Sequence, residues 1–181
     1  MDRHILLINP WIYDFSAYDL WYKPLGLLSL ASLLRIHGVH ITFIDCLDSD
    51  DPAMRHEPHI TMPKRKPSGE GSYAAERIPK PPPLKSVPRN FHRYGMTPRA
   101  FQNALKAISR PDLIMITSMM TYWYPGLFDT ISVVKSTYPG VPVVLGGNYV
   151  TLCPQHAPLS GADFCLPGPG ESSLPPLLND L

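Results

Sequence analysis

Two pairs of small residues have types and spacing that suit the binding of a bulky polar ligand. Gly146 and Gly147 directly follow an apolar run, and their two missing side chains let the backbone approach a ligand closely. Thr117 and Ser118 end another apolar run and offer hydroxyls and backbone N–H groups, which suit a phosphate or an amide-rich rim. Each pair also has an ordinary explanation, because glycine often marks a tight turn and a hydroxyl often caps one. The chemistry indicated is binding, and we expect no catalytic residue in this chain.

A further glycine-rich stretch, Gly168-Pro169-Gly170-Glu171, is only superficially similar to a phosphate-cradling loop. It lacks the Lys-Ser/Thr of a P-loop, and its glycine spacing does not fit a dinucleotide fingerprint. It falls after the last predicted strand and before a helical pattern. This position puts it beside the same ligand pocket.

The cysteines and charges exclude several classes of protein. Cys46, Cys153 and Cys165 form an odd, widely spaced set, which argues against a secreted disulfide framework and suits a cytoplasmic protein. Cys153 and His156 with a distant Cys165 make a poor metal site, so we expect no metal held by protein side chains. A net charge of +1 and the lack of a long apolar run predict binding to neither nucleic acid nor membrane.

Short apolar runs alternate with helical patterns along most of the chain. Strands are predicted at Ile5 to Ile8, His40 to Ile44, Leu113 to Thr117, Pro142 to Leu145 and Asp163 to Leu166. Helices are predicted to begin at Pro24, at Thr97-Pro98 and near Pro125, with a last one carrying Leu174, Leu177 and Leu178.

The segment 49–96 interrupts this alternation. Residues 49 to 100 hold ten of the sixteen Lys+Arg, five of the fifteen Asp+Glu and ten of the twenty-two prolines. We expect a basic, proline-rich insertion that wraps the surface without a regular element, contributes little to the core and is weakly packed.

Strands that are apolar throughout and alternate with helices predict a doubly wound parallel five-stranded sheet, in an α/β flavodoxin-like or Rossmann-like architecture. We expect residues 1–181 to form a single domain. In such sheets ligands bind beyond the carboxyl ends of the strands. The residues that follow each strand are therefore the candidates for binding.

Taken together, these motifs resemble the N-terminal cobalamin-binding domain of cobalamin-dependent radical SAM enzymes. LLINP, then PLGLLSLASLLRIHG, then IDCLD is similar to the opening of such domains. Ser118-Met119-Met120 followed by Gly146-Gly147 resembles the Ser-x-Leu and Gly-Gly signatures that hold the nucleotide tail of the cofactor. The closing Gly168 to Glu171 is similar to the Gly-x-Gly-Glu ending of the family, and RNFHRYG resembles an insertion found in a subset of it.

The resemblance implies a cobalamin-binding module for methyl transfer or other radical chemistry. Ser118 and Thr121 would contact the nucleotide tail, Gly146 and Gly147 would let it pass, and the loop at Asn9 would face the corrin ring. The full set of implied cofactor-binding residues is Asn9, Pro10, Trp11, Thr117, Ser118, Thr121, Tyr122, Gly146, Gly147, Asn148, Gly168, Gly170 and Glu171.

Two departures from the family qualify this implication. The chain has no Cys-x-x-x-Cys-x-x-Cys, so the [4Fe-4S] cluster and S-adenosylmethionine would belong to a separate radical SAM catalytic domain, in cis or in trans. It also has no Asp-x-His-x-x-Gly, which supplies a cobalt-ligating histidine in other cobalamin domains. The lower face of cobalt would be left to water, to nothing, or to Tyr13 or Tyr122.

Two other classes of protein share parts of this sequence pattern. A flavodoxin-like or receiver-type interaction domain without corrinoid has the same architecture, but Asn9 and Ser118 stand where a receiver needs acidic residues. A small hydrolase would need a Gly-x-Ser-x-Gly elbow, which the sequence lacks.

Overall fold

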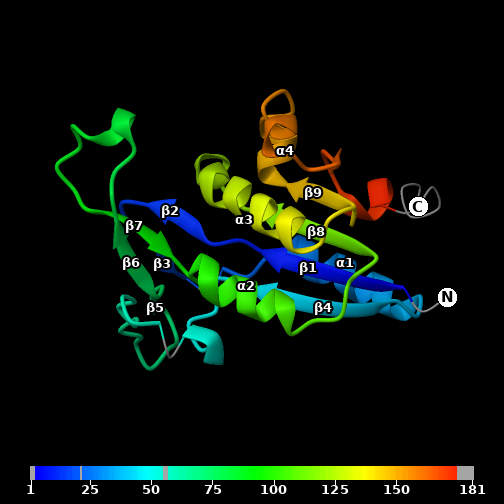
Figure 1. Cartoon of the computed structure of the whole chain (residues 1–181), viewed down its shortest axis with the longest axis horizontal. Coiled ribbons are helices and arrows are strands. Elements are labelled where there is room, and N and C mark those ends of the chain that lie inside the picture. Colours follow the sequence, from blue (N-terminus) through cyan, green and yellow to red (C-terminus); the bar gives the residue numbers. More distant parts are fainter. Residues whose placement is uncertain (1–2, 21, 55–56, 175–181) are drawn as a thin grey trace.

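The computed structural model describes residues 3–20, 22–54 and 57–174. Its centre is a parallel sheet in the order β10-β9-β8-β1-β4 (Figure 1). The strands are β1 (His4–Asn9), β4 (His40–Asp45), β8 (Leu113–Ser118), β9 (Val143–Gly147) and β10 (Phe164–Cys165). Numbered along the chain, this is the order 5-4-3-1-2 of flavodoxin-like folds. The predicted doubly wound five-stranded sheet is confirmed.

Helices cover both faces of this sheet. One face packs against α1 (Leu25–Ile36) through Leu27 and Leu34, and the other packs against α2 (Pro98–Lys106) and α3 (Tyr124–Thr137). The sequence predicted these three helices, and the expected cap of α2 is present, since Thr97 Oγ1 accepts from the Ala100 N–H at 2.9 Å. A short helix that was not predicted, α4 (Asn148–Leu152), follows β9 directly.

Residues 170–174 are also helical, as predicted for the start of a last helix. Leu174 is buried in the core on the α1 face. Leu177 and Leu178, predicted to extend this helix, lie outside the described residues. Within the described ranges, no helix has the length and apolar character needed to cross a bilayer.

The expectation that the segment 49–96 has no regular element is wrong. The segment supplies two strands of a three-stranded antiparallel sheet, ordered β2-β7-β6, and one strand of the two-stranded sheet β3-β5. These strands are β2 (Ile12–Asp14), β3 (Tyr18–Asp19), β5 (Gly71–Ser72), β6 (Ala75–Ile78) and β7 (Phe91–Tyr94). Figure 1 shows β2, β6 and β7 beyond the end of β1.

The insertion also packs into the core, contrary to the prediction. Met54, Ala74 and Met96 are at most 1% exposed and belong to the cluster that lies under α2 and α3. The strands were missed because each is at most four residues long, and because the partner of β7 in the aromatic loop lies almost eighty residues earlier in the chain.

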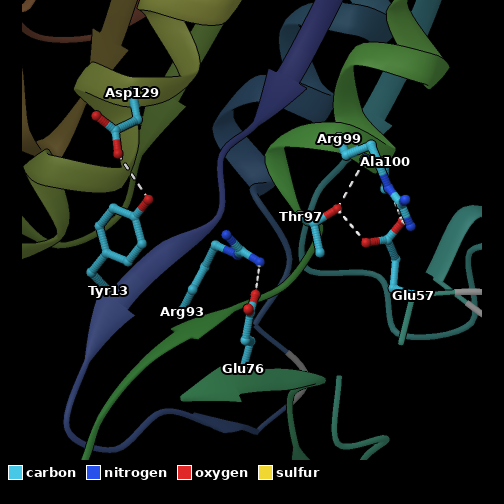
Figure 2. Close-up of polar contacts among 8 residues, drawn as sticks. All are labelled: Tyr13, Glu57, Glu76, Arg93, Thr97, Arg99, Ala100 and Asp129. Carbon is cyan, nitrogen blue, oxygen red and sulfur yellow. Dashed lines mark hydrogen bonds and ion pairs between the residues drawn. The ribbon is translucent and has the colours of Figure 1, made fainter. Parts of the chain in front are cut away.

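Polar contacts fix the insertion and the neighbouring strand β2 to the helices (Figure 2). Glu57 accepts hydrogen bonds from Thr97 Oγ1 at 2.8 Å and from Arg99 Nη2 at 3.0 Å, so one carboxylate ties the insertion to the first turn of α2. Tyr13 on β2 donates to Asp129 on α3 at 2.8 Å. The weak packing expected for this segment is therefore not what the structure shows.

Candidate functional site

A pocket of about 400 Å³ lies at the carboxyl ends of β8 and β9, on the face of the sheet that α1 covers. It brings together seven of the residues that the sequence predicted, contributed by β8, by β9 and the turn into α4, and by the loop before the last helix. They are Thr117, Gly146, Gly147, Asn148, Gly168, Gly170 and Glu171. Residues far apart in the sequence thus meet in one pocket beyond the strand ends, where ligands bind in this type of sheet.

The two glycines of the Gly146-Gly147 pair have different roles. A Cβ atom at Gly146 would have no atom closer than the Leu166 carbonyl oxygen at 3.9 Å, so the missing side chain leaves open space in the pocket. Gly147 has φ +93, and a Cβ there would lie 2.7 Å from Thr117 Oγ1 and 2.8 Å from the Ser118 carbonyl oxygen. Gly147 is therefore required by the packing of β9 on β8, whereas Gly146 provides the room.

The inner wall of the pocket is apolar. It is formed by Leu27 and Leu30 from α1, Met115 and Val144 from the sheet, and Leu174. The same side chains belong to the core cluster on this face or pack against it. An apolar floor beneath a polar mouth suits a ligand with one flat, uncharged end.

The polar mouth consists mainly of hydroxyl, amide and backbone groups. Thr151 Oγ1 accepts from the Gly168 N–H at 2.9 Å and donates to the Gly147 carbonyl at 3.2 Å, and so links the two glycine-rich segments. Asn148 Nδ2 donates to the Met119 carbonyl at 3.1 Å. Glu171 is the one charged side chain of the described residues that line the pocket. An anionic group of a ligand would therefore depend on backbone N–H donors here rather than on lysine or arginine.

Three other predicted residues meet at the topological switch point between β1 and β8. Asn9, Pro10 and Ser118 line a cavity of only about 10 Å³, too small for more than a water molecule. Asn9 Nδ2 donates to Asp45 Oδ1 at 2.7 Å, and Ser118 Oγ donates to the Met120 carbonyl at 3.0 Å. These polar groups are engaged in hydrogen bonds that stabilise the strand ends. A ligand here would contact the residues around them rather than these groups.

Trp11 does not occupy the position that the sequence suggested. Its side chain is 0% exposed and packs edge-to-face on Phe101 with ring centroids 5.4 Å apart. Its Nε1 is buried without a hydrogen-bond partner among the described residues. Trp11 is a core residue under α2, so its side chain is not available to a corrin ring.

Thr121 and Tyr122 lie outside the pocket, in the connection from β8 to α3. Tyr122 is 58% exposed, and Thr121 begins the short 3₁₀ turn Thr121–Trp123. Other exposed apolar side chains occur in the two connections at this edge, from β1 to α1 and from β8 to α3. They are Tyr18, Leu20, Tyr22 and Met120, and Leu25 follows at the start of α1. The carboxyl edge therefore presents much more apolar surface than the sequence analysis recognised.

The two tyrosines considered as cobalt ligands differ in availability. Burial, followed by the hydrogen bond to Asp129, raises the pKa of Tyr13 to about 12. Its hydroxyl is thus neutral and engaged with α3. Tyr122 alone of this pair stands free at the carboxyl edge.

Histidine is absent from the pocket in the described part of the chain. His4 and His40 lie at the amino ends of β1 and β4, and the others belong to the end of α1, the insertion or the segment after α4. These are His37, His59, His92 and His156. None lines the pocket or stands in the loop after β1.

Helix α1 also contributes to the pocket, which was not predicted. Gly26, in its first turn, lines the pocket, and a Cβ there would meet nothing within 4 Å. A glycine inside a helix costs roughly 1 kcal/mol relative to alanine, and this cost is the signal that could have drawn attention to it. Thr151 carried no such signal, because α4 was not predicted.

Comparison with known families agrees with this geometry. No curated protein matches the chain. Residues 92–178 match the family model of the B12 binding domain. The matched part runs from β7 to the last helix and includes β8, β9 and the glycine-rich loop, and it supports a cobalamin-binding domain in this part of the chain.

Proposed function

We propose that this chain binds cobalamin with the nucleotide tail in the pocket between α1, β8 and β9 and with the corrin ring over the carboxyl edge of the sheet. The observation that carries the proposal is the open space beside Gly146, inside the segment that matches the B12 binding domain. A long tail needs a channel without side chains at the strand end. Gly146 on β9 and Gly26 on α1 both line this pocket, and neither has a side chain that would fill it.

The chain's own residues suit the parts of this ligand. The apolar wall of Leu27, Leu30 and Val144 would enclose the tail base. The backbone N–H groups of Gly170 and Glu171, at the start of the last helix, would face its phosphate. The exposed tyrosines and leucines at the carboxyl edge would cover the apolar face of the corrin. When bound, the cofactor supplies cobalt-centred chemistry, and the protein supplies binding and orientation.

The radical part of the chemistry is proposed to come from a separate radical SAM domain, in cis or in trans. The three cysteines cannot act together as cluster ligands, because Cys46 follows β4 at one edge of the sheet and Cys165 lies on β10 at the other. Cys46 is also wholly buried, and burial raises the pKa of its thiol. A thiolate ligand set for an iron–sulfur cluster would therefore have to come from elsewhere.

Absorbance titration with hydroxocobalamin tests the binding, with Gly146→Leu as the informative variant. Leucine would fill the channel while the backbone at this position is not in the left-handed region, so the fold should persist. We expect Gly146→Leu to abolish cobalamin binding and Gly146→Ala to weaken it by less. Circular dichroism and a thermal melt check that each variant is folded.

Cobinamide, which lacks the nucleotide tail, separates the two parts of the proposal. The wild-type protein should bind it more weakly than cobalamin, and Gly146→Leu should affect its binding little. A folded wild-type protein that binds neither compound would overturn the cobalamin assignment and leave an interaction domain as the better candidate. Equal binding of both compounds would place the tail outside the pocket.

A further inference from the structure

The glutamates of the insertion are paired, whereas some of its basic side chains have no partner within the described residues. Glu57 accepts from Thr97 and Arg99, Glu76 pairs with Arg93, and Glu70 pairs with Lys66. The side chains of Lys64 and Arg77 have no ion pair or hydrogen bond within the described residues. Lys64 and Arg77 thus contribute to the positive surplus of this segment.

Lys64 and Arg77 line one pocket of about 400 Å³ between the two small antiparallel sheets. The described residues around it include no aspartate or glutamate. The wall is completed by hydroxyl, aromatic and apolar residues: Thr61, Met62, Pro63, Ser72, Tyr73, Ala75, His92 and Tyr94. It shares no residue with the pocket at β8 and β9.

His92 adds a third nitrogen group to this pocket. It lies directly opposite Arg77 in the β6–β7 pairing, and neither ring nitrogen has a hydrogen-bond partner in the described chain. Nδ1 is buried, which leaves Nε2 as the ring nitrogen open to the pocket. Burial, followed by the charge of Arg77, lowers the pKa of His92.

The neighbouring carboxylate does not line this pocket. Asp14 on β2 is opposite His92 in the sheet, but its oxygens accept from the Phe15 N–H at 2.6 Å and from Trp123 Nε1 at 2.9 Å. Tyr94 is the other titratable side chain that packs on the ring, with centroids 5.6 Å apart. The described residues that line the pocket therefore include two cationic side chains, Lys64 and Arg77, together with His92, and no carboxylate.

We propose that this pocket is a second ligand site, which binds the phosphate group of a small molecule through Lys64, Arg77 and His92. The three groups come from three segments, the loop before β5, strand β6 and strand β7, and they match an anion with three acceptor oxygens. A carboxylate carries a single charge, whereas a phosphate group carries nearly two at neutral pH, so two cationic side chains beside a histidine favour phosphate. The proposal does not depend on cobalamin binding.

The experiment follows the His92 ring by NMR in the full chain while inorganic phosphate is added at constant ionic strength. Bound phosphate should move the titration midpoint of His92 to higher pH, since the anion favours the protonated imidazole. Arg77→Gln should weaken phosphate binding about five- to tenfold, the effect of losing a charge-assisted hydrogen bond at a partly exposed site. Arg89→Gln removes the same charge from an exposed position of the insertion that does not line the pocket and is the matched control.

Three outcomes would overturn the proposal. Phosphate that leaves the His92 midpoint unchanged would show that the pocket takes no anion. Equal weakening by Arg77→Gln and Arg89→Gln would show only a diffuse response to charge. Acetate that binds as well as phosphate would contradict the assignment to a phosphate group. Because the readout uses protein without cobalamin, failure here leaves the proposed function intact, and failure of cobalamin binding leaves this test valid.

Discussion

At the scale of single residues, adjacent glycines can serve different purposes. Gly147 holds a left-handed backbone against β8, whereas Gly146 has ordinary geometry and faces space. The sequence marks both as small and identifies neither role, because the difference arises from contacts with Thr117 and Ser118 on another strand. Substitution therefore has to separate stability from binding at this pair.

We expect Gly147→Ala to destabilise the fold by about 1–3 kcal/mol, because it combines strained φ with a collision against backbone atoms. Gly146→Ala should change the free energy of unfolding by less than about 1 kcal/mol. Urea denaturation of both variants measures this difference. Similar losses of stability at the two positions would show that Gly146 is also required for packing. This result would contradict the proposed channel beside Gly146.

At the scale of elements, the sequence predicts those whose signal is local. The apolar runs of β1 and β8 and the Thr97-Pro98 start of α2 were recognisable because each pattern lies within one segment. The strands of the small sheet were not, because β6 and β7 read as proline-rich loop and are stabilised by pairing with distant β2. The same reason explains why Trp11 was misread, since its burial depends on Phe101 of α2.

The Glu57 contacts predict how firmly the insertion is held. Glu57→Gln should lower the free energy of unfolding by about 1–3 kcal/mol, because the half-buried carboxylate receives two side chains of the α2 start. Glu70→Gln is the control, since its ion pair with Lys66 joins two residues of the same loop, so this variant should change the free energy of unfolding less. Limited proteolysis should cut Glu57→Gln faster within the insertion. Equal resistance of the two variants to the protease would show that the Glu57 contacts add little to the stability of the insertion.

The Tyr13 contact between β2 and α3 predicts a dependence of stability on alkaline pH. The folded pKa of Tyr13 is raised to about 12, so the unfolded chain loses this proton first, near pH 10. Stability from this group is complete below about pH 10 and declines as the pH rises toward 12. Tyr13→Phe should show a shallower decline in urea midpoints over this range than the wild type. An unchanged slope would show that Tyr13 ionises equally in both states.

At the scale of the whole molecule, the two faces of the sheet have different tasks. The face under α2 and α3 holds the larger core and anchors the insertion, while the face under α1 leaves a pocket at its carboxyl end. Seven of the candidate residues could be predicted to lie near one another because parallel strands end at a common edge. It could not be foreseen that Asn9 and Ser118 would be used up in hydrogen bonds at the switch point.

The last prediction concerns the lower face of cobalt in the complex of the whole chain with its proposed cofactor. A tail lodged between α1, β8 and β9 would hold its base away from the metal, and no described histidine lines that pocket or the loop after β1 to replace it. Tyr122 is an exposed oxygen donor at this edge, but a neutral phenol is a weak ligand compared with imidazole. We therefore expect bound cobalamin, reduced to Co(II), to give an electron paramagnetic resonance spectrum without splitting from an axial nitrogen.

Free cobalamin at neutral pH, which shows that splitting from its own base, is the control. Tyr122→His should restore a nitrogen triplet if this side chain lies beneath the metal. A triplet in the wild-type complex would show that a nitrogen base remains on cobalt and that the tail does not occupy the pocket.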